Sequence, residues 1–325
     1  SVPLPPSNGA GSTLKNLGRT EGKGLETALT FEIFRNPKGF NWSADLTYFF
    51  NREKITQLTT PAEQANIGAG WFVGQPLSVI YDYKKIGIWQ TADQENGTLA
   101  KQTSPVQFPG QIRVEDVNGD GKIDANDRQI LGNFQPNWEG GLTNRFSYKN
   151  FDLSVVTFAR MGMKVIVPYL TGNSTGSGGF AFFNQGRVNQ VKTDYWTETN
   201  PTNAFPAPDA ASAVAYFGST LGYYDGSFVK VRSINLGYTF SSELIRKIGM
   251  SSARVYFNAT NPFIIYSPLV RDHLAVDPEG NSYASGQSTL NPQGASDRGT
   301  PERQIAVNLN NPPVRQFTLG VNLKF

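Results

Sequence analysis

The feature that most constrains the fold is a strict alternation of apolar and polar residues over long stretches. In residues 25–34, Leu25, Leu29 and Phe31 occupy one set of alternate positions, while mainly polar residues occupy the other. Residues 40–50 repeat the pattern after a turn of Asn, Pro, Lys and Gly at 36–39. A period of two is that of a β-strand, so the two stretches predict a hairpin.

The length of these predicted strands favours a membrane location. Strands in globular proteins usually contain about 5–6 residues, whereas a tilted strand needs about 9–11 residues to cross a bilayer. Trp42 and Tyr48 lie on the apolar side of the hairpin, and both residue types are enriched at membrane interfaces. A soluble sandwich would show the same alternation, so the hairpin alone leaves both architectures open.

The alternation recurs along the chain, and its connections are very unequal in length. Residues 138–155 predict a second hairpin with a tight turn at Lys149-Asn150, and further strands follow at 233–240 and 254–259. We expect roughly nine to eleven strands in total. Residues 167–225 and 266–311 form long connections, whereas a helical turn at 241–249 is short. Outer-membrane barrels show this combination of short periplasmic turns and long extracellular loops.

The chain ends on a fully alternating strand. Phe317, Leu319, Val321, Leu323 and the terminal Phe325 alternate with polar residues or Gly. An ordinary last strand can end on Phe by chance, but the complete alternation favours the terminal strand of an outer-membrane barrel.

Composition excludes several other classes. Apolar residues make up 38% and charged residues 17% of the chain, with 33 Gly, which disfavours a helical bundle. The net charge is +3 and the basic residues are scattered, so nucleic acid is not an expected partner. No Cys is present, so there are no disulfides, and no apolar run approaches the ~18 residues of a membrane helix.

One segment, residues 116–127, has the spacing of a calcium-binding loop. Oxygen-bearing side chains stand at loop positions one, three, five, nine and twelve, Gly121 stands at six, and the seventh residue offers its backbone carbonyl. The predicted ligands are Asp116, Asn118, Asp120, Lys122, Asp124 and Asp127. Asp127 replaces the usual Glu, which weakens or changes coordination, and an acidic turn without metal is the alternative. We expect a structural rather than a catalytic calcium ion.

Signatures of catalysis are poor. The single His273 lies in a charged stretch, and the carboxylates of Asp277 and Glu279 lie in a Pro-Gly turn, which argues against a hydrolase. The long connections are rich in aromatic residues, which stack on sugar rings or anchor a partner protein. We take Tyr195, Trp196, Phe182 and Tyr223 as candidate substrate contacts, with packing of the loops against each other as the alternative for each.

Several segments resemble the SusC/RagA family of TonB-dependent transporters. The chain is similar to the family's NxG…NKGLE, GxP…YxYxGIFQ and PGDIxYxDxNGDGxID motifs at residues 16–26, 74–89 and 109–133, although Gly22 replaces the usual Asn. Further matches in order and spacing are at residues 138–154, 225–239 and 254–263, so the resemblance covers nearly the whole chain.

The resemblance implies an all-β fold, an antiparallel transmembrane barrel of ~22 strands with a plugged lumen, of which residues 1–325 would supply roughly the C-terminal half. It also implies an N-terminal plug and a TonB box, neither of which is in this sequence, and a SusD-like surface lipoprotein as partner. The expected location is the bacterial outer membrane, in contact with the lipid bilayer. The expected function, without catalysis, is TonB-dependent import of an oligosaccharide or peptide; a secreted calcium-binding β-sandwich that binds glycans is the alternative.

Overall fold

A computed structural model describes most of the chain. The described residues are 2–3, 12–13, 18–99, 107–170, 194–208, 216–246, 249–275, 277–279, 282–283, 305–307 and 313–325. All statements about the structure below refer to these residues.

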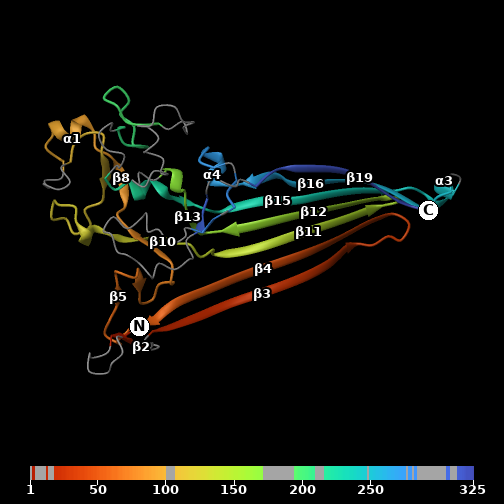
Figure 1. The fold of residues 1–325 in the computed structure, drawn as a ribbon, viewed down its shortest axis with the longest axis horizontal. Helices are drawn as coiled ribbons and strands as arrows, with labels where there is room; N and C mark the ends of the chain where they lie inside the picture. Colours follow the sequence, from red (N-terminus) through yellow and green to blue (C-terminus); the bar gives the residue numbers. More distant parts are fainter. Residues whose placement is uncertain are drawn as a thin grey trace.

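The dominant element is one antiparallel sheet of seven long strands (Figure 1). Its order is β19-β16-β15-β12-β11-β4-β3, so the long strands follow one another across the sheet in the order in which they occur in the chain. The strands are β3 (Arg19–Phe34), β4 (Phe40–Gln57), β11 (Trp138–Tyr148), β12 (Phe151–Met161), β15 (Phe228–Thr239), β16 (Ser252–Tyr266) and β19 (Gln316–Lys324). Up-and-down order with antiparallel pairing is the arrangement of a barrel wall.

These strands confirm the alternation seen in the sequence. The predicted hairpins correspond to β3–β4 and β11–β12, and the predicted terminal strand is β19. Seven long strands are fewer than the nine to eleven expected, and closer to a third than to a half of a ~22-stranded barrel. The remaining strands have only two to five residues, and all except β1 and β2 are in the connections between long strands.

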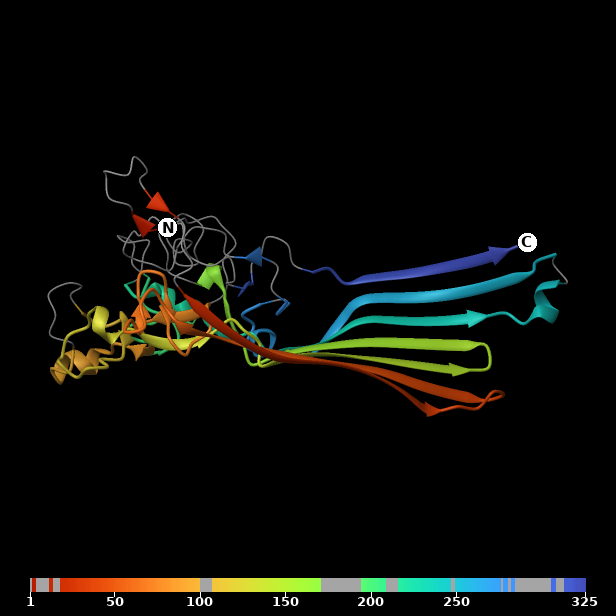
Figure 2. The ribbon, with the colours of Figure 1, turned by 90° about the horizontal axis from the view of Figure 1, so that it is seen from below.

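The connections are short at one end of the sheet and long at the other (Figure 2). The β3–β4 and β11–β12 turns and the link through α3 (Ser242–Arg246) lie at the same end, near the C-terminus. The described parts of the connections between β4 and β11, between β12 and β15, and between β16 and β19 lie at the opposite end. This confirms the predicted asymmetry.

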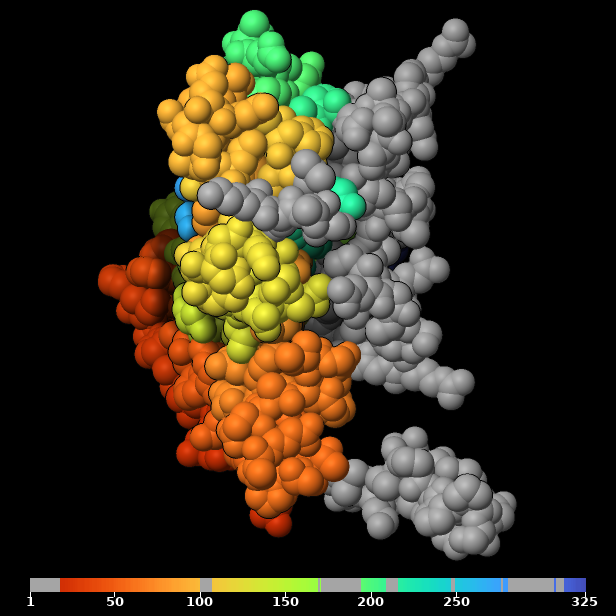
Figure 3. All heavy atoms as spheres, turned by 90° about the vertical axis from the view of Figure 1, so that its left-hand side faces the viewer, coloured from red at the N-terminus to blue at the C-terminus, as the bar shows by residue number. Residues whose placement is uncertain are grey.

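The long connections contain short elements of their own. Viewed onto this end, the β4–β11 connection covers a large part of the face, in orange and yellow, with residues near 200 in green beside it (Figure 3). The short strands are β5 (Ala65–Asn66), β6 (Trp71–Phe72), β7 (Val79–Asp82), β8 (Lys85–Ile88), β9 (Ile112–Val114), β10 (Gln129–Asn133), β13 (Lys164–Ile166), β14 (Tyr223–Asp225), β17 (Ser282–Tyr283) and β18 (Ile305–Ala306). β1 (Val2–Pro3) and β2 (Ser12–Thr13) form a separate pair.

Helices are few and short in the described residues. They are α1 (Thr91–Glu95), α3, α4 (Pro268–Arg271) and the 3₁₀ turns η2 (Ala125–Asp127), η3 (Pro168–Leu170) and η4 (Gly218–Gly222). None of the described helices is both long enough and apolar enough to cross a membrane.

The buried apolar core lies at the loop end rather than on the sheet. Among the described residues, three clusters of buried side chains lie there; the first includes Ile88, the second Val165 and the third Phe134. In the part of the chain that the structure describes, no second sheet covers the apolar face of the seven-stranded sheet, whose side chains stay exposed, with Leu25 51% and Leu29 45% exposed. A β-sandwich buries that face against its partner sheet. The alternative prediction of a soluble β-sandwich is therefore wrong.

Candidate functional site

The two faces of the long sheet differ in chemistry, and we call the apolar one the outer face. Cross-strand pairing brings its side chains into rows, one of which runs through Trp42, Phe146, Leu153, Leu236, Phe257 and Leu319. Leu236 is 42% and Leu319 75% exposed. A continuous exposed apolar surface of this kind requires an apolar environment, and a transmembrane barrel provides it.

The opposite, inner face of the sheet is polar and carries paired charges. Acidic and basic side chains from different strands pair on this face, between β11 and β4 in Arg145–Asp45, between β12 and β11 in Arg160–Glu139, and across β15 in Arg254–Asp152. Charged side chains of this kind require contact with water or with other polar groups, which the water-filled interior of a barrel or a polar plug provides.

A buried ion cluster ties a long connection to the inner face. The side chain of Lys230 on β15 is 1% exposed, and its Nζ lies 2.7 Å from Asp277 Oδ2 and 3.2 Å from Glu279 Oε2. Glu279 also pairs with Arg232, whose guanidinium lies 3.8 Å from the centre of the Phe158 ring. Burial alone would raise the pKa of Glu279, but the charges of Arg232 and Lys230 outweigh it and hold that pKa below its usual range.

This cluster was not predicted from the sequence. A register shift between Val231 and Ser233 leaves Arg232 outside the regular pairing, so strand periodicity does not give its direction. The carboxylates of Asp277 and Glu279, whose position in a Pro-Gly turn argues against a hydrolytic pair, are both engaged in ion pairs with Lys230.

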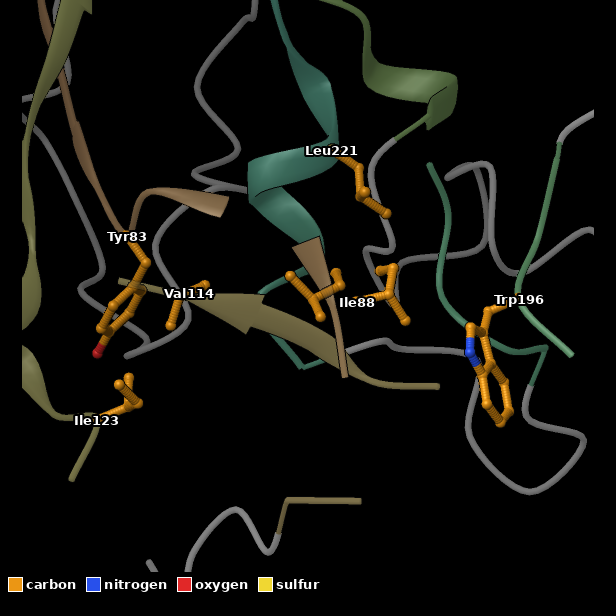
Figure 4. Packing of buried hydrophobic residues seen from close by; sticks show 7 residues of the cluster. Tyr83, Ile88, Val114, Ile123, Trp196 and Leu221 are labelled. Carbon is orange, nitrogen blue, oxygen red and sulfur yellow. The ribbon is translucent and has the colours of Figure 1, made fainter. Parts of the chain in front are cut away.

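The first buried cluster joins three distant segments of the loop end (Figure 4). Ile88 of β8 and Val114 of β9 pack with Trp196 and Leu221, which come from the β12–β15 connection. Trp196 is 8% exposed, and its Nε1 donates a hydrogen bond to Gln90 Oε1 at 2.8 Å. The long connections therefore pack into a folded unit with its own core.

The candidate aromatic contacts lie in different environments. Trp196 belongs to the buried cluster just described, and Tyr223 is half-buried, with its hydroxyl donating to Asp82 Oδ2 at 2.7 Å. Burial and the nearby Asp82 carboxylate raise the pKa of Tyr223 well above its usual value. Tyr195 is 40% exposed, and Phe182 lies outside the described residues. Tyr195 is thus the described candidate with the most accessible ring.

The loop at residues 116–127 adopts a tight turn held by its own carboxylates. Asp116 Oδ1 and Oδ2 accept from the amides of Gly119 at 2.7 Å and Gly121 at 2.8 Å. Gly121 has φ +78°, which is the left-handed conformation that the sixth loop position requires. The carboxylate of Asp127 is fully buried and accepts from the amides of Val117 at 2.9 Å and Asp124 at 2.7 Å.

The fit of this loop to a metal ion is mixed. In the part of the chain that the structure describes, no three Asp, Glu, His or Cys side chains lie close enough together to hold a metal ion. Asn118 and Asp124 use their side-chain oxygens to accept from Asp120 and Asn126 amides, as in a turn without metal. Each carboxylate oxygen keeps a further lone pair for a cation. Calcium therefore stays a prediction from the spacing.

Comparison with known proteins identifies the family. TonB-dependent receptor P3 of Formosa agariphila is 28% identical over 334 residues, which cover 99% of this chain and 30% of the receptor. SusC of Bacteroides thetaiotaomicron is 26% identical over 283 residues, which cover 82% of this chain and 25% of SusC. The chain belongs to the SusC/RagA-like family of TonB-dependent receptors. No family model matches the sequence.

The fold agrees with that of a solved family member. The RagAB peptide importer in its "open-open" state matches with a TM-score of 0.62 and 20% identity, covering 100% of this chain and 31% of that one. The "closed-closed" state matches with a TM-score of 0.59. The chain spans about 30% of the length of the curated relatives that it matches.

Membership of the SusC/RagA-like family orients the molecule. TonB-dependent receptors are outer-membrane proteins and not enzymes, as the resemblance implied. The outer face of the sheet is then the lipid-facing one, and the end with the long connections is extracellular. The buried ion cluster and the aromatic residues lie at that extracellular end.

Proposed function

We propose that this chain is the C-terminal part of the barrel of a receptor that imports an oligosaccharide or peptide with energy from TonB. The observation that carries the proposal is the polarity of the sheet, whose outer face is apolar and whose inner face carries paired charges, in a chain of the SusC/RagA-like family. A polar inner face gives hydrophilic cargo a path that avoids the bilayer.

The packed loop end supports a partner on the extracellular side. The described parts of three connections share buried clusters, so they present a preformed surface. RagAB, which has the same fold, is a peptide importer. We propose that a SusD-like lipoprotein covers this surface, and that the N-terminal plug and TonB box belong to the same receptor beyond the sequence given.

The proposal is tested by uptake in a strain that depends on the complete receptor. Cells lacking the receptor gene are complemented with the wild type or with a TonB-box deletion, and uptake of labelled oligosaccharides and peptides is measured. We expect one substrate class to require both the receptor and the TonB box. Unchanged uptake of both classes in the deletion strain would refute the import proposal.

We also propose that residues 116–127 bind a structural calcium ion through Asp116, Asn118, Asp120, the Lys122 carbonyl, Asp124 and Asp127. Support comes from the ligand spacing and from the positive φ of Gly121 at the position where such loops need it. A bound ion would stiffen the loop between β9 and β10.

Hydrogen exchange of the loop amides tests the calcium proposal. Calcium at 100 times its Kd would stabilise the loop by about 2.7 kcal/mol, so we expect chelation to speed exchange at Gly119 and Gly121 about a hundredfold. Asp120→Ala should abolish this response, whereas Glu95→Gln, which removes an exposed carboxylate on α1, should retain it. Identical exchange with and without chelator would favour the metal-free turn.

A further inference from the structure

Two groups of aromatic side chains mark the edges of the lipid-facing band on the outer face. One lies near the short turns, where Phe40 stacks with Phe146 at 6.1 Å between ring centres. The other lies toward the extracellular end, where Tyr48 contacts Phe50 and Trp138 at 6.1 and 6.0 Å. Ten residue steps separate Phe40 from Phe50 along β4, which at about 3.3 Å per residue and a tilt of ~40° gives about 25 Å. This is the height of the apolar band of an outer-membrane barrel.

A charged pocket lies directly beyond the extracellular edge of this band. Leu25 pairs with Phe50, and the next positions on the same face are Lys23 paired with Arg52 and Glu21 paired with Lys54. These positions lie two and four residues past Phe50 and Leu25, or about 5–10 Å above the band. They line a cavity of about 350 Å³ together with Glu53, Gly74, Pro76, Asn133, Gln135 and Asn137.

The charges lining the pocket favour an anion. Three cations, Lys23, Arg52 and Lys54, face two carboxylates, Glu21 and Glu53. Glu21 is shared between Lys23 at 3.0 Å and Lys54 at 3.5 Å, and these side chains are exposed, so the pairs are weak and open to competition.

Arg52 adds a further positive charge to the pocket, and its guanidinium donates hydrogen bonds to neutral acceptors. Its guanidinium donates to Pro136 O at 2.7 Å, Asn137 O at 2.8 Å and Asn137 Oδ1 at 2.9 Å. Among the salt bridges of the described residues, none joins Arg52 to a carboxylate. These bonds hold the cation in the lining of the pocket.

We propose that this pocket binds the phosphate-bearing headgroup of an outer-leaflet lipid, whose acyl chains lie along the apolar outer face below it. The match is one of depth and of charge: the cations lie at headgroup level, and the apolar rows continue beneath them without a break. Basic residues at a membrane surface attract anionic headgroups, each by about a factor of five in affinity. Because the pocket is on the outer face, the site is separate from the path proposed for imported cargo.

Lipid binding to the complete receptor in neutral detergent tests this site. The probes are bisphosphorylated lipid A, the same lipid without its phosphates, and inorganic phosphate, each followed by native mass spectrometry. We expect lipid A to bind the wild type, and Lys23→Gln/Lys54→Gln to weaken it about 25-fold. Glu21→Gln, which removes the competing carboxylate, should tighten binding. Arg52→Lys keeps the charge but loses the bonds to Pro136 and Asn137, so it should weaken binding less than the double variant.

Charge-matched controls decide the outcome. Lys38→Gln/Lys149→Gln removes two cations at the turn end of the sheet and should leave lipid A binding unchanged. Equal losses in both double variants, or equal binding of the lipid with and without phosphates, would overturn the proposal. So would inorganic phosphate that binds as tightly as lipid A, since the ligand would then be a free anion. Unchanged uptake in the TonB-box deletion strain, together with lipid A binding that depends on Lys23 and Lys54, would count against the import proposal alone.

Discussion

The buried ion cluster gives the sharpest quantitative prediction, because it links one strand to a loop through charges removed from water. The Lys230 side chain is 1% exposed and that of Asp277 8%. Removing one member leaves the other charge buried without its partner, which costs about 3–5 kcal/mol. Since Glu279 stays within 3.2 Å of Lys230, we expect Asp277→Asn to lie near 3 kcal/mol and Lys230→Met nearer 5.

The double variant Lys230→Met/Asp277→Asn separates this explanation from simple loss of a contact. It removes both charges, so no uncompensated ion stays buried, and we expect a cost of only about 1–2 kcal/mol. The double variant should therefore be more stable than either single one. The coupling energy between the two positions would then exceed the about 0.5–3 kcal/mol that is usual for neighbouring residues.

Hydrogen exchange in the complete, lipid-embedded receptor measures this cost where it acts. The backbone amides of Arg271, Asp272 and Leu274 donate hydrogen bonds to carbonyl groups of α4 and of the residue that precedes it. Their exchange therefore reports on local opening of the β16–β19 connection. A loss of 3 kcal/mol corresponds to exchange about a hundredfold faster or more. Arg271→Gln, which removes an exposed ion pair with Asp272 on the same segment, is the control and should change exchange at most fivefold. Additive effects of the two single substitutions would refute the reasoning.

Three further outcomes follow from the structure. Because Glu279 has a lowered pKa, its contribution to anchoring is complete above about pH 4.3 and lost as the pH falls through the folded-state pKa, so exchange of this connection should rise only in acid. Trp196→Ala should destabilise the loop end by about 3–5 kcal/mol in thermal melts of the receptor, and by more than Tyr195→Ala, because the Tyr195 side chain is already 40% exposed; Tyr195→Ala should lower substrate affinity in titrations. Gly320→Val would place a Cβ 2.2 Å from the Tyr256 ring, so we expect a loss of about 1–3 kcal/mol in urea unfolding; unchanged stability would contradict that close packing.

Strand positions were predictable from the sequence because the outer face needs an apolar residue at every second position. Leu319 and Val321 show this most clearly, since lipid contact alone accounts for their alternation with Thr318 and Gly320. The position of a turn followed equally from local chemistry, and Lys149 indeed adopts a positive φ of 52° between β11 and β12.

The loop end was not predictable in the same way, because its contacts join residues far apart in the sequence. Trp196 hydrogen-bonds Gln90, and Lys230 pairs with Asp277, and neither pairing leaves a local pattern. An aromatic side chain in a long connection is equally consistent with an exposed contact and with a buried anchor. Only the packing distinguishes Tyr195 from Trp196, which adjoin in the sequence but differ in exposure, 40% against 8%.

The distribution of buried residues implies a division of roles within the receptor. The sheet has an exposed apolar face and relies on the bilayer as its apolar partner, whereas the long connections bury their own clusters around Ile88 and Val165. The second cluster joins the β12–β15 connection to Leu269 in the β16–β19 connection, and the Lys230–Asp277 pair holds that connection against the inner face. A substitution in one connection therefore changes the packing of another. Exposed positions such as Tyr195, which is outside these clusters, can vary with a smaller penalty, so we expect differences in cargo between receptors of this family to concentrate there rather than at the buried anchors.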